Sequence, residues 1–356
     1  MRIVISTGGT GGHINPALAL AEELKGLNHT ILFMGGLYGP EKSRAGKAGF
    51  DFVGLSIRGL DRSNVLATTK ALFLLPLAVL KAMKVFITFQ PHAVVGVGGY
   101  ASSPAVIAAA LRKIPLFLME QNVYPGVVTR KFAKKALKVF TAFEGSNEWL
   151  KGAEISLAGN PVRKGFAFGS KRDFYTKKKT LLVMGGSQGA RSINRSVIAA
   201  LPALKEVGIE IYHHTGPYDC KEVSEAYALH FPDGVVKEFF DDIDSVMGGA
   251  HLALCRAGAM TCAELAVVGL PSILIPYPGA GGHQRLNAKE MSDHGAAVTI
   301  DDSELNAEKL VETIKGLLKE PERLELMSAN CRETARPDAT ERIVSEIEKS
   351  MEGKWV

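Results

Sequence analysis

The chain has 356 residues, of which 46% are hydrophobic and 22% charged, and its formal net charge is +5. These proportions exclude a disordered, collagenous or coiled-coil protein, and the length exceeds one compact core, so we expect two domains. The four cysteines form no C-x-x-C pair and no secretory leader is recognisable, which predicts a reducing, cytoplasmic compartment. The longest apolar run, Ala71 to Leu80, is too short to span a bilayer, so we expect no membrane crossing.

The charge is unevenly distributed along the chain. Residues 1–160 contain 18 Lys and Arg against 9 Asp and Glu, whereas the remainder contains 24 against 28. A basic first half predicts contact with a polyanion, either nucleic acid or an anionic membrane surface. We favour the membrane and expect no nucleic acid, because the basic stretches lack interleaved aromatic residues and no recognition motif is present.

The chain opens with a β-branched apolar stretch, Arg2 to Ser6, that leads directly into a glycine-rich segment, Thr7 to His13. Asn15 and Pro16 are residue types of a helix N-cap and first turn, which predicts a helix over residues 17–25. The order is strand, glycine loop, helix.

The same order returns three times. The predicted strands are Ala93–Val97, Thr180–Met184 and His251–Cys255, and the loops after them contain Gly98-Gly99, Gly185-Gly186 and Gly258. The helices that follow are expected over residues 103–113, from about residue 190, and through Glu264 to Val268. Short strands that alternate with helices at this spacing predict parallel βαβ units.

A turn-rich segment, Gly159 to Arg163, is followed by charged sequence without apolar periodicity as far as Lys179. We place the domain boundary there, between residues 1–162 and 163–337. The predicted fold class is α/β, with two Rossmann-like, doubly wound parallel-sheet domains. They would face each other across a cleft at the carboxyl ends of their strands, where such folds bind ligands.

The glycine loops indicate the kind of ligand. Between a strand and a helix, glycines let the backbone approach a phosphate, and the helix N-terminus supplies unpaired N–H groups. Four such junctions favour a nucleotide or sugar-phosphate ligand. Gly96 to Ala101 also fits the fingerprint G-x-G-x-x-A, with Glu120 as a ribose-binding acid, so an NAD(P) oxidoreductase is an alternative; against it, the first loop does not fit.

Two side chains near these loops are candidates for chemistry. Glu264 could grip the two hydroxyls of a ribose, although an exposed helical glutamate is the simpler interpretation of its position. His13 ends the first glycine loop, where an imidazole could serve as a general base, or it could be a solvent-exposed loop histidine.

Metal sites are not favoured. Asp242-Ile243-Asp244 resembles the D-x-D pair with which some glycosyltransferases hold a divalent metal, but a helix start explains it better. His213 and His214 are neighbours on a predicted strand and point to opposite faces, so they cannot ligate one metal together. We expect no metal and no cofactor.

A dense apolar stretch runs from Leu72 to Ile87; Lys70 lies just before it, and Lys81 and Lys84 interrupt it. A basic cluster lies in the same half of the chain: Arg130, Lys131, Lys134, Lys135 and Lys138. A buried helix with solvated charges is one interpretation, and a patch that docks on anionic lipid is the other.

Eight runs occur together in the order found in one family. They are GGTGGHINPALALAEEL from Gly8, GVGGYASSPAVIAA from Gly96, EQN from Glu120, GNPVR from Gly159, GGSQGARSIN from Gly185, CRAGAMTCAELAVVGLP from Cys255, HQRLNA from His283 and PDATERI from Pro337. With these runs the chain resembles, over essentially its whole length, the MurG family of peripheral-membrane N-acetylglucosaminyltransferases of bacterial peptidoglycan synthesis.

The resemblance implies a GT-B fold with the acceptor domain first, the UDP-GlcNAc donor domain second, and a C-terminal helix, about residues 338–356, that joins the first domain. It implies transfer of GlcNAc from UDP-GlcNAc to the C4 hydroxyl of MurNAc in undecaprenyl-pyrophosphoryl-MurNAc-pentapeptide (lipid I), which gives lipid II. It also implies a peripheral position on the cytoplasmic face of the inner membrane, with the anionic membrane surface and cell-wall synthesis and division proteins as partners.

By the same resemblance, Phe240 would meet the uracil through its backbone, Glu264 the ribose and Ser187 the diphosphate. Gln284 and Asn122 would contact the GlcNAc hydroxyls, and Arg163 is a candidate cationic contact. The implied substrate site consists of Thr10, Gly11, Gly12, Asn122, Arg163, Ser187, Phe240, Ala259, Met260, Thr261, Cys262, Ala263, Glu264 and Gln284.

An α-linked donor and a β-linked product imply one in-line displacement with inversion. The acceptor hydroxyl then needs a base, for which His13 is the candidate, and the departing UDP needs protein groups that stabilise its charge. Two alternatives remain besides the oxidoreductase: a UDP-GlcNAc 2-epimerase of the same architecture, which would not use a lipid-docking patch, and a non-catalytic membrane scaffold, which would not use His13 or Glu264.

Overall fold

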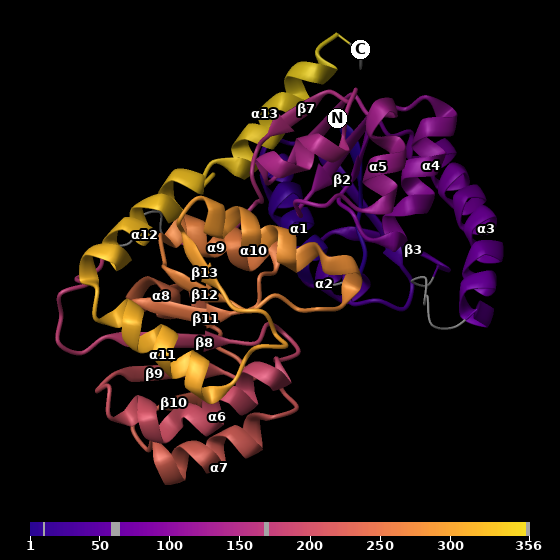
Figure 1. Cartoon of the computed structure of the whole chain (residues 1–356). Helices are drawn as coiled ribbons and strands as arrows, with labels where there is room; N and C mark the ends of the chain where they lie inside the picture. The colour runs from indigo at the N-terminus through magenta and orange to yellow at the C-terminus, as the bar shows by residue number, and fades with distance from the viewer. Residues whose placement is uncertain (10, 58–64, 167–170, 354–356) are drawn as a thin grey trace. The chain divides into compact units, whose positions relative to one another are not determined.

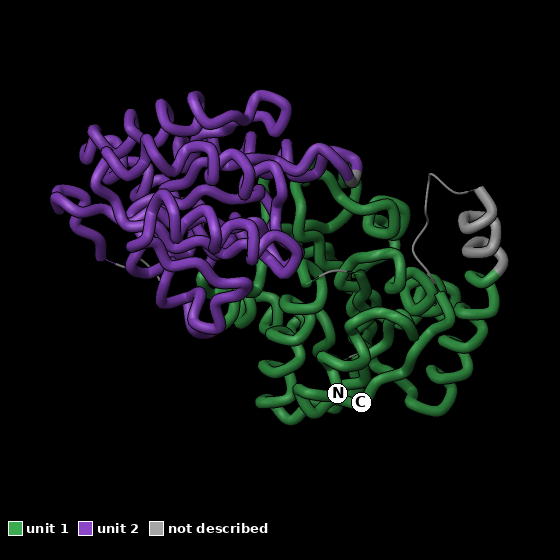
Figure 2. The backbone as a smooth tube through the Cα atoms, turned by 90° about the horizontal axis from the view of Figure 1, so that it is seen from below, with its two compact units in different colours: residues 1–163, 337–356 green, residues 164–336 purple. Residues whose placement is uncertain are grey.

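The computed structural model describes residues 1–9, 11–57, 65–166 and 171–353, with only the backbone for residues 65–73 and 280. The chain forms two compact units, Met1–Arg163 with Pro337–Val356 and Lys164–Arg336 (Figure 2). Each contains a parallel sheet between helices, so the predicted pair of doubly wound α/β domains is confirmed. No helix of the described residues is both long and apolar enough to cross a membrane.

In unit 1 the described residues form a seven-stranded parallel sheet of order β3-β2-β1-β4-β5-β6-β7. Its strands are β1 Arg2–Ser6, β2 Thr30–Gly36, β3 Asp51–Leu55, β4 Ala93–Gly96, β5 Leu116–Glu120, β6 Lys138–Thr141 and β7 Ile155–Leu157. The helices of this unit are α1 Gly11–Gly26, α2 Glu41–Lys47, α3 Val65–Phe89, α4 Ser103–Arg112, α5 Val127–Phe132 and α13 Ala339–Met351 (Figure 1).

Alternate side chains of the unit 1 strands enter two different cores. Ile3 and Ile5 of β1 pack with Leu20 of α1 and Ile343 of α13, while Val4 enters the core formed with α3 and α4. This alternation follows from the two-residue period of a strand and makes the strands apolar on both faces. The C-terminal helix α13 therefore completes one face of the first sheet although it comes last in the chain.

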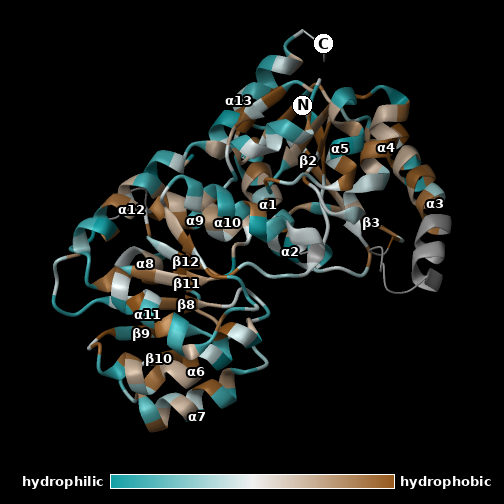
Figure 3. Ribbon diagram, viewed as in Figure 1, coloured by the Kyte–Doolittle hydropathy of each residue, from teal (hydrophilic) through white to brown (hydrophobic). Residues whose placement is uncertain are grey.

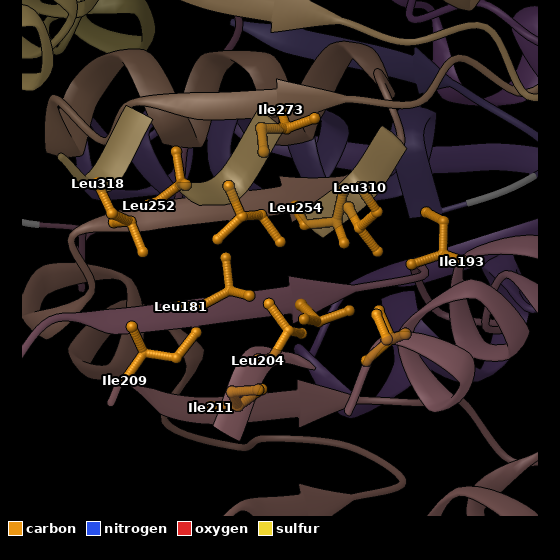
Figure 4. Packing of buried hydrophobic residues seen from close by; sticks show 14 of the residues in the cluster. Leu181, Ile193, Leu204, Ile209, Ile211, Leu252, Leu254, Ile273, Leu310 and Leu318 are labelled. Carbon is orange, nitrogen blue, oxygen red and sulfur yellow. The ribbon is translucent and has the colours of Figure 1, made fainter. Parts of the chain in front are cut away.

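Unit 2 contains a six-stranded parallel sheet of order β10-β9-β8-β11-β12-β13. Its strands are β8 Thr180–Met184, β9 Glu210–His214, β10 Val235–Lys237, β11 Leu252–Cys255, β12 Ser272–Leu274 and β13 Ala297–Thr299. The helices are α6 Arg191–Lys205, α7 Cys220–His230, α8 Ile243–Gly249, α9 Ala259–Val268, α10 His283–Asp293, α11 Ala307–Leu318 and α12 Pro321–Thr334. Figure 4 shows Leu181 and Leu254 of adjacent strands packed with Leu204 and Leu310 of the covering helices.

Three of the predicted helices have the expected positions, and one starts earlier than expected. Helices α4, α6 and α9 lie where the glycine junctions placed them, and α9 ends at Gly269 in the left-handed conformation (φ 69°). The prediction that the first helix begins near Asn15 and Pro16 is wrong, because α1 begins at Gly11. Glycine can adopt helical angles, so the end of the glycine segment is the first turn of the helix and exposes that turn's N–H groups.

One member of the predicted basic cluster is paired inside unit 1. Lys138 Nζ lies 2.9 Å from Glu346 Oε2 of α13, and the same carboxylate accepts a 2.7 Å hydrogen bond from Ser156. These partners lower the pKa of Glu346 despite its partial burial, which opposes the shift. Lys138 therefore fixes α13 on the sheet, and only the other four residues of the cluster contribute exposed charge.

His213 on β9 joins three elements inside unit 2. Its Nδ1 lies 3.1 Å from Tyr227 Oη of α7, and its Nε2 lies 3.1 Å from Asn194 Oδ1 of α6. Asn194 in turn donates to Thr215 O and to Asp219 Oδ2. Burial lowers the pKa of His213 to about 3, so the imidazole is neutral in the folded protein at neutral pH.

This burial predicts a pH-dependent stability. An unfolded chain binds a proton at His213 below about pH 6.5, whereas the folded chain does not until about pH 3. The stabilisation is thus complete above pH 6.5, and the free energy of unfolding should fall by about 1.4 kcal/mol per pH unit as the pH drops from 6.5 towards 4. The free energy of unfolding, measured by urea unfolding at a series of pH values, should fall less steeply with decreasing pH in the His213→Gln variant, by this amount per pH unit. The exposed His230→Gln serves as control, and equal slopes for wild type and His213→Gln would contradict the prediction.

Candidate functional site

The strand order of each sheet defines one point where the order reverses. In unit 1 the reversal lies between β1 and β4, and in unit 2 it lies between β8 and β11. In open parallel sheets, ligands bind outside the carboxyl ends of the strands at such points. The predicted glycine loops follow β1, β4, β8 and β11, so all four lie at these two positions.

In unit 1 the loops after β1 and β4 lie against each other backbone to backbone. A Cβ atom on Gly99 would overlap the backbone oxygen of Gly8, and Gly99 has a φ of 76° that disfavours other residues. Gly9 donates its N–H to Glu41 Oε1 at 2.8 Å, so the buried Glu41 carboxylate holds the loop in place. Gly11 and Gly12 follow in the first turn of α1 and are half-buried, whereas Thr10 lies outside the described residues.

His13 lies in the first turn of α1 and is half-buried. Its Nδ1 is 2.8 Å from Oε1 of Gln121, which directly follows β5. Asn122, the next residue, is half-buried, and its backbone carbonyl accepts a 3.1 Å hydrogen bond from Ser146. The structure thus brings His13 and the segment of Asn122 together at the same edge of the first sheet.

Glu120 has a structural role that the sequence did not predict. It is 4% exposed and accepts hydrogen bonds from the backbone N–H groups of Asn122 at 3.1 Å and Gly126 at 2.9 Å. A carboxylate occupied in shaping its own loop is a poor ribose ligand. The oxidoreductase alternative loses the acid on which it depended.

In unit 2 the loops after β8 and β9 repeat the backbone contact of unit 1. A Cβ atom on Gly189 would overlap Thr215 O, and one on Gly216 would overlap the backbone nitrogen of Gly189. Both glycines have positive φ, 78° and 75°. Ser187 lies at the exposed tip of the β8 loop, just before α6 begins.

The segment Ala259 to Glu264 is the first part of α9, which begins after the N-cap Gly258. Met260, Thr261, Ala263 and Glu264 are half-buried, whereas Ala259 and Cys262 are buried. Burial raises the pKa of the Cys262 thiol to about 12, so this side chain is an inert part of the core. A ligand at this segment would meet the backbone of Cys262 and the side chain of Glu264.

The remaining implied site residues lie farther apart. Phe240 follows β10, two strands from β8, and its side chain is 2% exposed with Lys237 Nζ 5.1 Å from the ring centroid, so a ligand would contact its backbone. Gln284, in the first turn of α10, accepts a 2.9 Å hydrogen bond from Tyr277 N through Oε1. Arg163 is exposed and ends the first segment of unit 1.

Sequence reasoning missed a charged cluster at the carboxyl edge of the second sheet. Arg256, directly after β11, lies 2.6 Å from Asp302 Oδ1 and donates to Ser192 Oγ at 2.9 Å. Ser192 also donates to Asp302 at 2.6 Å, and these bonds lower the pKa of Asp302 against the opposing effect of burial. The signal was present, since a basic residue immediately after an apolar strand lies at the ligand-binding edge.

The aspartates of the D-x-D sequence begin a helix, as expected. Asp242 is the N-cap of α8 and Asp244 lies in its first turn. His213 faces α6 and α7, whereas His214 packs against Phe239 with ring centroids 5.3 Å apart. Within the described ranges, no group of three or more His, Cys, Asp or Glu side chains could hold a metal ion.

Two family models match the chain. The glycosyltransferase family 28 N-terminal domain matches residues 3–141, and the glycosyltransferase family 28 C-terminal domain matches residues 180–343. The first lies in unit 1 and the second covers most of unit 2 and part of α13.

Relatives of similar length match almost the whole chain. The chain is 42% identical over 350 residues to the UDP-N-acetylglucosamine--N-acetylmuramyl-(pentapeptide) pyrophosphoryl-undecaprenol N-acetylglucosamine transferase of Nitratidesulfovibrio vulgaris (strain DP4), which covers 96% of both chains. It is 38% identical to the protein of the same name from Myxococcus xanthus (strain DK1622), over all of this chain and 94% of the relative.

Solved structures are similar over almost the whole chain. MurG of Acinetobacter baumannii has a TM-score of 0.82 at 28% identity and covers 98% of this chain and 99% of its own. A UDP-GlcNAc 2-epimerase of Neisseria meningitidis bound to UDP-GlcNAc shares the fold alone, with a TM-score of 0.67 at 14% identity over 98% of this chain and all of its own. The chain therefore belongs to glycosyltransferase family 28, in the branch of the N-acetylglucosamine transferases that act on pyrophosphoryl-undecaprenol.

Proposed function

We propose that the chain transfers N-acetylglucosamine from UDP-GlcNAc to the C4 hydroxyl of MurNAc in lipid I, and so forms lipid II for peptidoglycan. The observation that carries the proposal is the full-length identity of 42% to a transferase of that name. The glycine loops and the first turn of α9 support it, because they present backbone N–H groups where a sugar nucleotide would need them.

The donor is assigned to unit 2. The Ser187 loop and the N-terminus of α9 would meet the diphosphate, Glu264 the ribose hydroxyls, the backbone of Phe240 the uracil, and Gln284 the sugar. In unit 1, Asn122, Arg163 and the glycines of the first loop are proposed as further substrate contacts. Arg256, which is paired with Asp302, adds a cationic group to the carboxyl edge of the second sheet.

The reaction would be a single displacement with inversion. His13 Nε2 would take the proton of the acceptor hydroxyl while the hydroxyl oxygen forms a bond to C1 of GlcNAc. The bond from C1 to the β-phosphate oxygen breaks at the same time, and UDP leaves with that electron pair. Loop N–H groups would stabilise the charge that develops on the leaving diphosphate.

The test is transfer of labelled GlcNAc from UDP-GlcNAc to a lipid I analogue by purified protein, with EDTA present. We expect a β-linked disaccharide product and release of UDP. An assay that detects no transfer, or that detects only epimerisation of UDP-GlcNAc, would contradict the proposed function.

Removal of the Glu264 carboxylate should weaken donor binding. Charge-assisted hydrogen bonds to a ribose contribute about 1.5–3 kcal/mol each, so Glu264→Ala should weaken UDP-GlcNAc binding by tenfold or more. Calorimetry measures this directly. The matched control is Glu290→Ala, a half-buried glutamate on α10, which should retain wild-type affinity. Undiminished affinity of Glu264→Ala would remove this residue from the site.

We further propose that unit 1 docks on the membrane through α3. Leu77, Leu80 and Ile87 are each more than 60% exposed, and with the exposed Lys84 they follow a three- and four-residue spacing that puts them on one side of the helix. The opposite side packs into the core through Phe86. Exposed large apolar side chains at this density mark an interaction surface.

The helices that follow α3 carry further exposed apolar and basic side chains. Helix α3 packs on α4, which packs on α5, and Leu111 of α4 is 65% exposed. Figure 3 shows hydrophobic residues on α4 and on the coloured part of α3. Four exposed basic residues of the predicted cluster lie on and after α5: Arg130, Lys131, Lys134 and Lys135. Basic residues beside exposed apolar side chains fit an anionic lipid surface. The part of the predicted patch from Lys70 to Phe73 lies outside the described side chains.

Vesicle binding tests this surface. Each basic residue near an anionic membrane contributes about 1 kcal/mol, so Lys84→Ala should weaken sedimentation with phosphatidylglycerol vesicles by about fivefold, less at high salt. Leu80→Ser should weaken it as well. Leu229→Ser, at a leucine of α7 that is even more exposed than Leu80, is the control that should bind normally. Equal binding to neutral and anionic vesicles, or normal binding by both α3 variants, would contradict the proposal.

A further inference from the structure

The partner of His13 carries an inference that rests on the proposed base role and adds a residue to it. Gln121 is 2% exposed, and its Oε1 lies 2.8 Å from His13 Nδ1. An amide oxygen can only accept a hydrogen bond, so this contact requires the proton on Nδ1. A neutral imidazole with its proton on Nδ1 keeps the lone pair on Nε2.

Gly98 lies against both partners of the contact between His13 and Gln121. A Cβ on Gly98 would lie 2.9 Å from His13 Nδ1 and 3.1 Å from Gln121 Oε1. The Cα hydrogen of Gly98 that occupies this direction therefore points at both groups. Gly98 therefore packs directly against the contact between the imidazole and the amide. Gly98 has a φ of 84°, so the position excludes a side chain on two grounds.

The backbone of Gln121 is also held in place by a hydrogen bond. Its carbonyl accepts a 3.1 Å hydrogen bond from the buried Asn160 side chain. Among the described residues, His13 Nε2 has no hydrogen-bond partner, and the same is true of the buried amide nitrogen of Gln121. The arrangement leaves Nε2 of His13 available to accept a proton from a substrate hydroxyl.

We infer that Gln121 is a positioning residue that holds His13 as the Nδ1–H tautomer, with Nε2 presented to the acceptor hydroxyl as the proton acceptor. The neutral amide orients the ring as a carboxylate would, but without adding a charge that favours the imidazolium. Gly98 makes room for this pair.

The tautomer can be measured without activity. In ¹⁵N-histidine-labelled protein above neutral pH, His13 should show a protonated, pyrrole-type Nδ1 and a pyridine-type Nε2; its signals are identified by their loss in His13→Gln. Gln121→Met should abolish this preference, while Gln90→Met, an exposed glutamine of unit 1, should preserve it. A protonated Nε2 in the wild type would overturn the inference.

Kinetics supply the second readout. Gln121→Met should lower kcat roughly 10-fold, less than the 10²–10⁴-fold expected for His13→Gln, with little change in KM for UDP-GlcNAc. Gln121→Glu should move the acidic limb of the kcat profile to higher pH by roughly 1 unit, because a carboxylate beside Nδ1 favours the protonated ring.

A double variant separates this inference from the base role. If Gln121 acts through His13, then Gln121→Met adds no further loss in the His13→Gln background. A full additional loss there would overturn the inference. A His13→Gln variant with normal kcat would instead refute the proposed base, and the tautomer measured by NMR would still report on Gln121 independently.

Discussion

Backbone-to-backbone contact between neighbouring glycine loops is the constraint on which both candidate sites depend. In unit 1, Gly99 lies against Gly8, and in unit 2, Gly216 lies against Gly189. Parallel strands place all the loops that follow them at the carboxyl edge of the sheet, where side chains would otherwise separate neighbouring loops. Because no Cβ intervenes, each pair of loops comes close enough to expose N–H groups to one ligand.

Polar side chains then fix these loops from the protein side. Glu41 accepts from the first loop of unit 1, Glu120 accepts from the loop after β5, and Gln121 orients His13. In unit 2, Asn194 binds the loop after β9, and Asp302 pairs with Arg256. Buried polar groups of this kind are costly unless they are hydrogen-bonded, so their partners are fixed and the loops are pre-organised.

The two units share a parallel-sheet architecture but carry different groups at the carboxyl edges of their sheets. Unit 1 combines an imidazole at its carboxyl edge with exposed apolar and basic side chains on α3 to α5, as the proposed lipid-linked acceptor would require. Unit 2 combines glycine loops with a glutamate on α9, as the proposed sugar-nucleotide donor would require, while the neutral His213 lies in its core. The exposed cations Arg130, Lys131, Lys134 and Lys135 all lie in unit 1 and contribute to the basic charge of the first half of the sequence.

The sequence alone determined the two parallel-sheet domains and the glycine junctions, because apolar β-branched runs, glycine pairs and helix caps act through the local backbone. It also supplied the motifs that identify the family. It could not place the start of α1, because the helical angles of Gly11 are decided by packing and not by capping preference. Nor could it pair His13 with Gln121, which is 108 residues away, or Lys138 with Glu346, 208 residues away. Such pairs exist only after the strands are aligned in the sheet, since a register of several parallel strands decides which loop ends meet.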